Sequence, residues 1–204
     1  TGSSIAGGAG AYFYTYVLGD MKLMSGVSVI GLIASLVGIV MGPYLANRFG
    51  KKKVYLTAVI ISTALNLLRL LGVTSMILIY ISALIGGVAG GWMVPVNTSI
   101  QADNTTYVQY KTGKRAEAAI ASLTSFVSKV AQGLGGAIPG YVIAAYGFVT
   151  GASVQPESIN TGIILCALIL PLIFGILGLL IFGTQYTLDQ KAVIEMDAKI
   201  NRNN

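Results

Sequence analysis

The chain has 204 residues, of which 54% are hydrophobic and only 10% charged, and its formal net charge is +6. A soluble domain covers its surface with about 25% charged residues, so this composition predicts an all-α protein that is embedded in lipid. One cysteine and no histidine exclude a disulfide framework and argue against ordinary zinc sites and histidine-dependent catalytic triads.

Apolar runs and turn signals divide the chain into six predicted helices. A run of about 20 apolar residues crosses a hydrocarbon layer of roughly 30 Å. The first run, residues 5–18, is too short to span, and we expect the chain to be a piece of a longer protein. The others cover residues 25–46, 54–71, 75–101, 118–146 and 159–182. We therefore predict a six-helix transmembrane bundle over residues 1–183 and a cytoplasmic C-terminal tail over residues 184–204.

Basic residues gather in alternate loops. The second loop, the fourth loop and the tail hold Arg48, Lys51, Lys52, Lys53, Lys111, Lys114, Arg115, Lys191, Lys199 and Arg202. The intervening loops hold only Lys22. By the positive-inside rule, we expect a multi-pass protein of the cell (inner) membrane with these loops and its C-terminus in the cytoplasm. The basic residues are then orienting flanks, so no nucleic-acid partner is expected.

The turn after the second run carries a recognisable motif. Residues 42–53 read Gly-Pro-Tyr-Leu-Ala-Asn-Arg-Phe-Gly-Lys-Lys-Lys. They resemble the motif between paired helices of the major facilitator superfamily: Gly, then an acidic residue, Arg, a variable residue, Gly and two basic residues. The resemblance implies that Gly50 makes a tight turn and that Arg48 acts as a cytoplasmic latch. Asn47 stands where an acidic residue is usual, and a plain basic turn is the alternative interpretation.

A second motif begins at Asp103. Residues 103–117 read Asp-Asn-Thr-Thr-Tyr-Val-Gln-Tyr-Lys-Thr-Gly-Lys-Arg-Ala-Glu, followed by Ser122, Phe126 and Lys129. This pattern resembles the glycoside–pentoside–hexuronide:cation symporters, the family of the melibiose carriers. The resemblance implies that the chain is the C-terminal half, helices 7 to 12, of a twelve-helix major facilitator. The family often has further acids where this chain has Thr106 and Gln109, which implies a smaller cytoplasmic ion-pair network.

Lys129 is a candidate functional residue on physical grounds alone. It lies inside the fifth run, 14 residues beyond Arg115, or about 21 Å along a helix. An ammonium group at that depth in a bilayer is costly and indicates a function. Thr124 and Ser125, one turn earlier, offer hydroxyl groups to a substrate at the same level, although such groups also bond their own helix backbone.

Trp92 is the candidate sugar-stacking residue. It precedes Asp103 by 11 residues and so lies deeper than the interfacial belt in which most membrane tryptophans occur. An aromatic face suits the C–H face of a sugar. Packing between two helices is the alternative.

Together with these residues, the resemblance implies secondary transport of a sugar or glycoside with Na⁺ or H⁺ by alternating access between two six-helix halves. We expect no cofactor, and we expect Lys129 to couple the sugar to the cation. Asp103, Arg48 and Arg115 are placed to form a cytoplasmic gate. The resemblance implies that the acids of the cation site belong to a partner, the N-terminal half.

Two other classes of function stay open. A membrane enzyme without histidine is restricted to a serine–lysine or paired-acid scheme, and we do not expect an enzyme. A non-transporting membrane scaffold would have no need of a lysine at mid-depth.

Overall fold

The computed structural model describes residues 2–114, 116–152, 154–188 and 190–202, and within these ranges the protein is helical and has no strand. The all-α prediction is confirmed. In chain order the helical elements are α1 (Gly2–Tyr12), η1 (Phe13–Val17), α2 (Lys22–Phe49), α3 (Lys51–Leu71), α4 (Met76–Thr112), α5 (Glu117–Ala145), α6 (Ser158–Ile164), η2 (Leu165–Ile169), α7 (Leu170–Gln185) and α8 (Gln190–Arg202). The two η elements are single π turns within longer helices.

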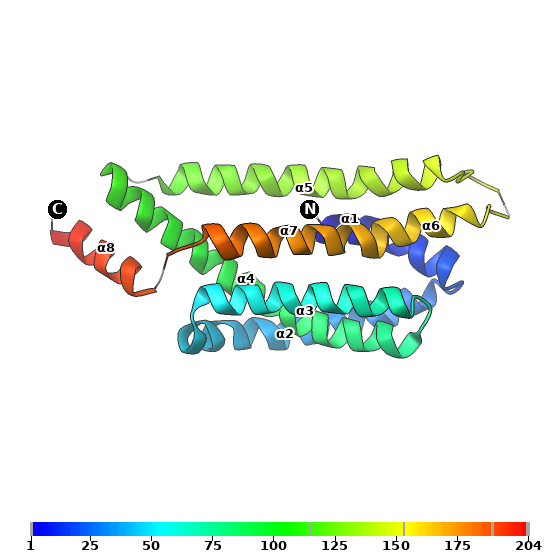
Figure 1. The fold of residues 1–204 in the computed structure, drawn as a ribbon, viewed down its shortest axis with the longest axis horizontal. Coiled ribbons are helices and arrows are strands. Elements are labelled where there is room, and N and C mark those ends of the chain that lie inside the picture. The colour runs from blue at the N-terminus through cyan, green and yellow to red at the C-terminus, as the bar shows by residue number, and fades with distance from the viewer. Residues whose placement is uncertain (1, 115, 153, 189, 203–204) are drawn as a thin grey trace.

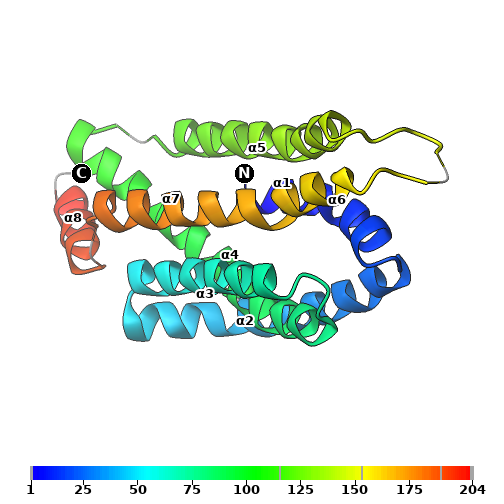
Figure 2. The same cartoon turned by 45° about the vertical axis from the view of Figure 1, so that its right-hand side comes forward.

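The long helices lie roughly parallel or antiparallel to one another in an elongated bundle (Figure 1). Helices α2, α3 and α4 pack together, while α1 packs against α5 and α7, and α7 joins the two groups by packing against α3. In both views, α5 lies on the far side of α7 from α2 and α3 (Figures 1 and 2). Helix α4 leaves the α2–α3 group and ends near α8.

Four helical stretches of the described residues are long and apolar enough to cross a membrane: Lys22–Phe49, Lys51–Leu71, Met76–Thr112 and Ser158–Gln185. The first helix of the chain, α1 with η1, is shorter. Helix α5 has sufficient length at 29 residues but is more polar, because it carries Lys129, Gln132 and several serine and glycine residues.

Helix α4 differs from its prediction. The apolar run suggested an end near residue 101, but the helix continues to Thr112 and is 37 residues long, about 55 Å. It therefore exceeds the thickness of a hydrocarbon layer. Its last turns are polar, which made them resemble a loop in the sequence. The helix ends where Gly113 adopts the left-handed conformation with φ +69°. Helix α8 likewise lies where only a tail was predicted.

Helices α2 and α4 approach so closely that glycine is required between them. A Cβ atom on Gly91 would overlap the backbone of Ser35, and one on Gly38 would overlap the backbone of Val88. By contrast, a Cβ atom on Gly90 meets nothing within 4 Å. Small residues that let backbones meet are typical of membrane helix interfaces. Gly87 and Gly91 therefore lie on the face of α4 that packs against α2, and Gly90 does not.

The main buried cluster lies around the two π turns, where α1, α5, α6 and α7 meet. Its largest fully buried side chains include Phe13, Ile143, Ile159 and Ile163. Elsewhere many large apolar side chains are exposed on the outer faces of the helices, such as Leu32 and Val40 of α2. A soluble protein rarely exposes so much apolar surface, and this distribution is the one expected of a helix bundle in lipid.

Candidate functional site

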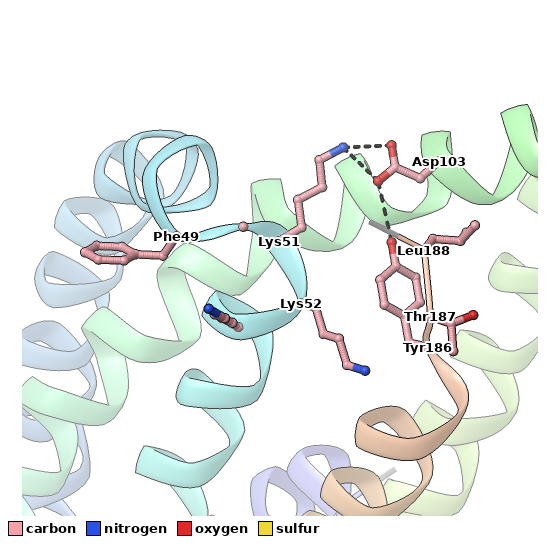
Figure 3. Close-up of a pocket in the computed structure, with 9 residues that line it drawn as sticks. Phe49, Lys51, Lys52, Asp103, Tyr186, Thr187 and Leu188 are labelled. Atoms are coloured by element: carbon pink, nitrogen blue, oxygen red, sulfur yellow. Dashed lines mark hydrogen bonds and ion pairs between the residues drawn. The ribbon is translucent and has the colours of Figure 1, made fainter. Parts of the chain in front are cut away.

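The most strongly organised polar cluster of the described residues joins three separate segments at one end of the bundle. Both carboxylate oxygens of Asp103 accept hydrogen bonds from the Lys51 ammonium, at 2.7 and 2.8 Å. The Tyr186 hydroxyl donates to the same carboxylate at 3.5 Å. Figure 3 shows Lys51 and Tyr186 approaching Asp103 from different elements. We call these three residues the Asp103 cluster.

Burial makes this ion pair different from an ordinary surface pair. The side chain of Asp103 is only 8% exposed and that of Lys51 only 19%. Among the described residues, Asp103 is the one polar or charged side chain in the buried class. A buried carboxylate requires a compensating charge and hydrogen bonds, and Lys51 with Tyr186 supplies both.

Local sequence positions each member of the cluster. Gly50, with φ +87°, ends α2 and lets α3 begin at Lys51, so the lysine stands at the very start of its helix. Asp103 is held in place because α4 continues as a helix beyond the apolar run that ends near residue 101. Tyr186 directly follows α7, and its ring stacks on Phe182 with centroids 4.7 Å apart. Phe182 in turn contacts Tyr55 of α3.

The Tyr186 phenol keeps its proton at neutral pH. Burial, and then the charge of Asp103 and the hydrogen bond to it, raise the pKa of Tyr186 to about 12. A protonated phenol donates to a carboxylate, whereas a phenolate would repel it. The segment after α7 is therefore attached to α4 by a donor that stays intact throughout the physiological pH range.

Two of the three residues predicted to form the gate, Asp103 and Arg48, are among the described residues, and they do not pair with each other. Asp103 lies in the cluster, but its ionic partner is Lys51. The Arg48 guanidinium instead approaches the Tyr44 hydroxyl, at 3.4 Å, and the ring of Phe49. Arg115 lies outside the described residues.

Sequence reasoning missed Lys51 and Tyr186. Lys51 carried one available signal, since it directly follows the glycine that ends a helix. Tyr186 carried none, because its role depends on a contact 83 residues away in sequence.

The predicted substrate residues of α5 remain on an open surface. Lys129 and Ser125 are exposed, and Lys129 makes no hydrogen bond or ion pair with any described residue. The Thr124 hydroxyl donates to the Ile120 carbonyl of its own helix at 2.8 Å, as hydroxyl groups in membrane helices commonly do.

Trp92 does not join these residues. It lies on α4 and packs against the buried cluster of Ala46, Val54, Val96 and Ile100, which come from α2, α3 and α4. Its indole nitrogen is buried and makes no hydrogen bond with the described residues. This environment favours the alternative interpretation, a tryptophan packed between helices.

Comparison with known proteins identifies the family. The family model described as MFS/sugar transport protein matches residues 1–190. The chain belongs to this family. It is 31% identical over 204 residues to a glucuronide carrier protein homolog of Escherichia coli strain K12, covering 96% of this chain and 44% of the relative. It is 32% identical over 191 residues to an uncharacterized symporter of Bacillus subtilis strain 168, covering 91% and 41%.

A third relative is the isoprimeverose transporter of Lactiplantibacillus pentosus, 28% identical over 73% of this chain and 31% of the relative. The chain thus spans less than half the length of these relatives. Membership of the family, together with the apolar helices, makes this a multi-pass membrane protein. The relatives are transporters, which favours transport over the enzyme alternative.

Proposed function

We propose that this chain forms the C-terminal six-helix half of a sugar or glycoside:cation symporter that works by alternating access. The observation that carries the proposal is the family match over residues 1–190. It is supported by the names of the relatives, which include a glucuronide carrier homolog, an isoprimeverose transporter and a symporter. The partner is an N-terminal half of six helices, and the coupling ion is Na⁺ or H⁺.

In this proposal the open face of α5 borders the sugar pathway. Its exposed side chains include Ser122, Ser125 and Lys129, which supply hydroxyl groups and one cation at the level of the bilayer. Lys129 needs an anionic partner, because an unpaired charge within a membrane is costly. A carboxylate of the N-terminal half would serve both Lys129 and the coupling ion, and competition for it would couple sugar affinity to ion binding.

The Asp103 cluster acts as the cytoplasmic gate of the same mechanism. It ties the start of α3 and the segment after α7 to α4, so its opening would release three elements together. The basic residues of this end of the bundle support a cytoplasmic orientation by the positive-inside rule. Arg48 and Arg115 stay in the proposal as gate residues that contact the other half.

The test is uptake of labelled sugars by the full-length protein, with and without imposed Na⁺ and H⁺ gradients. The panel contains a glucuronide, isoprimeverose and melibiose. We expect ion-driven accumulation of at least one of them. Lys129→Ala should abolish accumulation above the external concentration. Lys22→Ala, which removes a lysine at the end of α2 away from the Asp103 cluster, should leave accumulation intact.

Two results would overturn the proposal. If no ion gradient drives accumulation of any panel sugar, the symport assignment fails. If Lys129→Ala cells still concentrate the sugar as the parent does, the coupling role of Lys129 fails even though transport stands.

A further inference from the structure

Two hollows flank the turn between α2 and α3. The first, which we call the apolar groove, has a volume of about 400 Å³ and is lined by Met41, Leu45, Phe49, Lys53, Val54, Thr57 and Trp92. The second, the basic pocket, has a volume of about 230 Å³ and is lined by Phe49, Gly50, Lys51, Lys52, Lys53, Asp103, Tyr186, Thr187 and Leu188. Both include Phe49 and Lys53, so one molecule that passes over the turn can reach both.

The apolar groove suits a hydrocarbon chain. Its one hydroxyl group, on Thr57, already donates to the Lys53 carbonyl at 2.8 Å, and the indole nitrogen of Trp92 is buried. The remaining lining is apolar except for the Lys53 side chain. An occupant with hydrogen-bonding groups along its length would leave them unsatisfied here, whereas an acyl chain would not.

The charges beside the groove favour an anion. Lys51 is neutralised by Asp103, and this is the one ion pair found among the described residues. Lys52 and Lys53 form none with them, and both lie in the first turn of α3, where the backbone amides add positive potential. A phosphate would gain two ammonium groups here, and a head group that also carries a cation, as a zwitterionic lipid does, would gain less than an anionic one.

The length of the groove agrees with one leaflet of a bilayer. Trp92 lies 11 residues before Asp103 on α4, about 16 Å along the helix axis, and Asp103 is level with the start of α3, since it binds Lys51. Half of a hydrocarbon layer is about 15 Å thick. The outer wall of the groove is exposed: Met41 and Phe49 are 40% and 53% accessible.

We propose that the apolar groove and the basic pocket together bind one anionic phospholipid, with an acyl chain along Trp92 and the phosphate on Lys53 and Lys52. The site is independent of which solute is transported, and it does not depend on the orientation of the protein in the membrane. Through Phe49 and Lys53 the lipid would lie against the same turn that presents Lys51 to Asp103.

The test uses quenching of Trp92, which is the one tryptophan of this chain. The full-length protein is placed in nanodiscs of phosphatidylcholine that contain a minor fraction of phosphatidylglycerol brominated at mid-chain. Matched nanodiscs contain the same fraction of phosphatidylcholine brominated at the same positions. Subtracting the signal of Trp92→Phe isolates the emission of Trp92. Bromine quenches on contact, so the brominated phosphatidylglycerol should quench several-fold more than its zwitterionic counterpart.

Variants locate the head group. A lysine near an anionic surface contributes about fivefold in affinity, so Lys53→Gln should lower the preference for phosphatidylglycerol about fivefold, and Lys52→Gln with Lys53→Gln should remove it. Lys114→Gln makes the same change of charge in another basic loop and should leave the preference intact. Equal quenching by the two lipids, no quenching by either, or an equal loss in Lys114→Gln would each overturn the proposal.

Discussion

Breaking the Lys51–Asp103 pair from its two sides should have unequal effects on stability. Lys51→Met leaves the Asp103 carboxylate, 8% exposed, without a counter-charge. Removing one partner of a buried pair costs about 3–5 kcal/mol. Because the Tyr186 hydroxyl still donates to Asp103 and the pair lies at the end of the bundle, we expect the lower end, about 3 kcal/mol.

Asp103→Asn should cost less. It leaves the Lys51 ammonium unpaired, but Lys51 is 19% exposed and its flexible stem can carry the charge to water. We expect about 1.5–2 kcal/mol, the lower end of the range for one lost hydrogen bond to a charged group. Lys51→Met combined with Asp103→Leu removes both charges and should return close to the parent, since apolar replacement of a buried pair is often neutral.

Thermal unfolding in detergent measures these differences. Cys166 is fully buried, so a thiol-reactive fluorophore reports the loss of the fold. At roughly 2–4 °C per kcal/mol for a chain of this size, Lys51→Met should lower Tm by about 6–12 °C and Asp103→Asn by about 3–8 °C. If the double variant loses the sum of the two single effects, the residues are uncoupled and the cluster is not the stabilising unit described above.

Three further predictions concern the α2–α4 interface, the Tyr186 phenol and the orientation of the chain. Gly91→Ala should destabilise the bundle by about 1–2 kcal/mol, because overpacking costs 1–3 kcal/mol and the gain in helix propensity is at most about 1. Gly90→Ala should be neutral or stabilising, and equal effects would contradict the assignment of the packed face. Burial first, and then the Asp103 carboxylate, raise the pKa of Tyr186, so the stability gained by keeping its phenol protonated is present below pH 10 and is lost as the pH rises through about 12. A phenolate absorbance titration against Tyr186→Phe should show no ionisation of this group at pH 10. Cysteines at Lys52 and Lys114 should react with an impermeant thiol reagent only from the cytoplasmic side, and labelling of intact cells would reverse the proposed orientation.

Hydropathy and turn chemistry predict an all-α chain and most of its long helices, but they miss α8 and the last turns of α4. The apolar runs determine where helices cross lipid, and Gly50 separates α2 from α3 as the turn motif indicates. The same reasoning placed the end of α4 too early, because a change from apolar to polar residues indicates where a helix leaves the membrane and not where the helix ends. Nothing after residue 101 breaks the helix until Gly113, so the backbone continues into water.

The cluster was harder to predict than the helices. Asp103 stood out as an acid at the end of an apolar run, but its partner depends on how α4 passes the first turn of α3, 52 residues earlier in the sequence. Three adjacent lysines and an arginine compete for that position, and only the crossing of the helices selects Lys51. Pairing of this kind is a property of tertiary geometry, which a single sequence without related sequences does not contain.

Lys129 was found from its position alone, because a charge deep inside an apolar run stands out without knowledge of its partner. The buried residues of α5 all lie in its second half, where Gly135 meets the backbone of Ser4 so tightly that a Cβ atom would overlap it. Its first half, around Lys129, is exposed on every side, including Phe126 and Val127. The face that carries Ser125 and Lys129 is exposed. An ammonium group 12 residues into a 29-residue helix, about 18 Å from its start, has no reason to persist on a surface that lipid covers. We infer that this face is covered by polar groups and an acid from outside the chain, and the loss of ion-driven accumulation in Lys129→Ala is the measurement on which that inference depends.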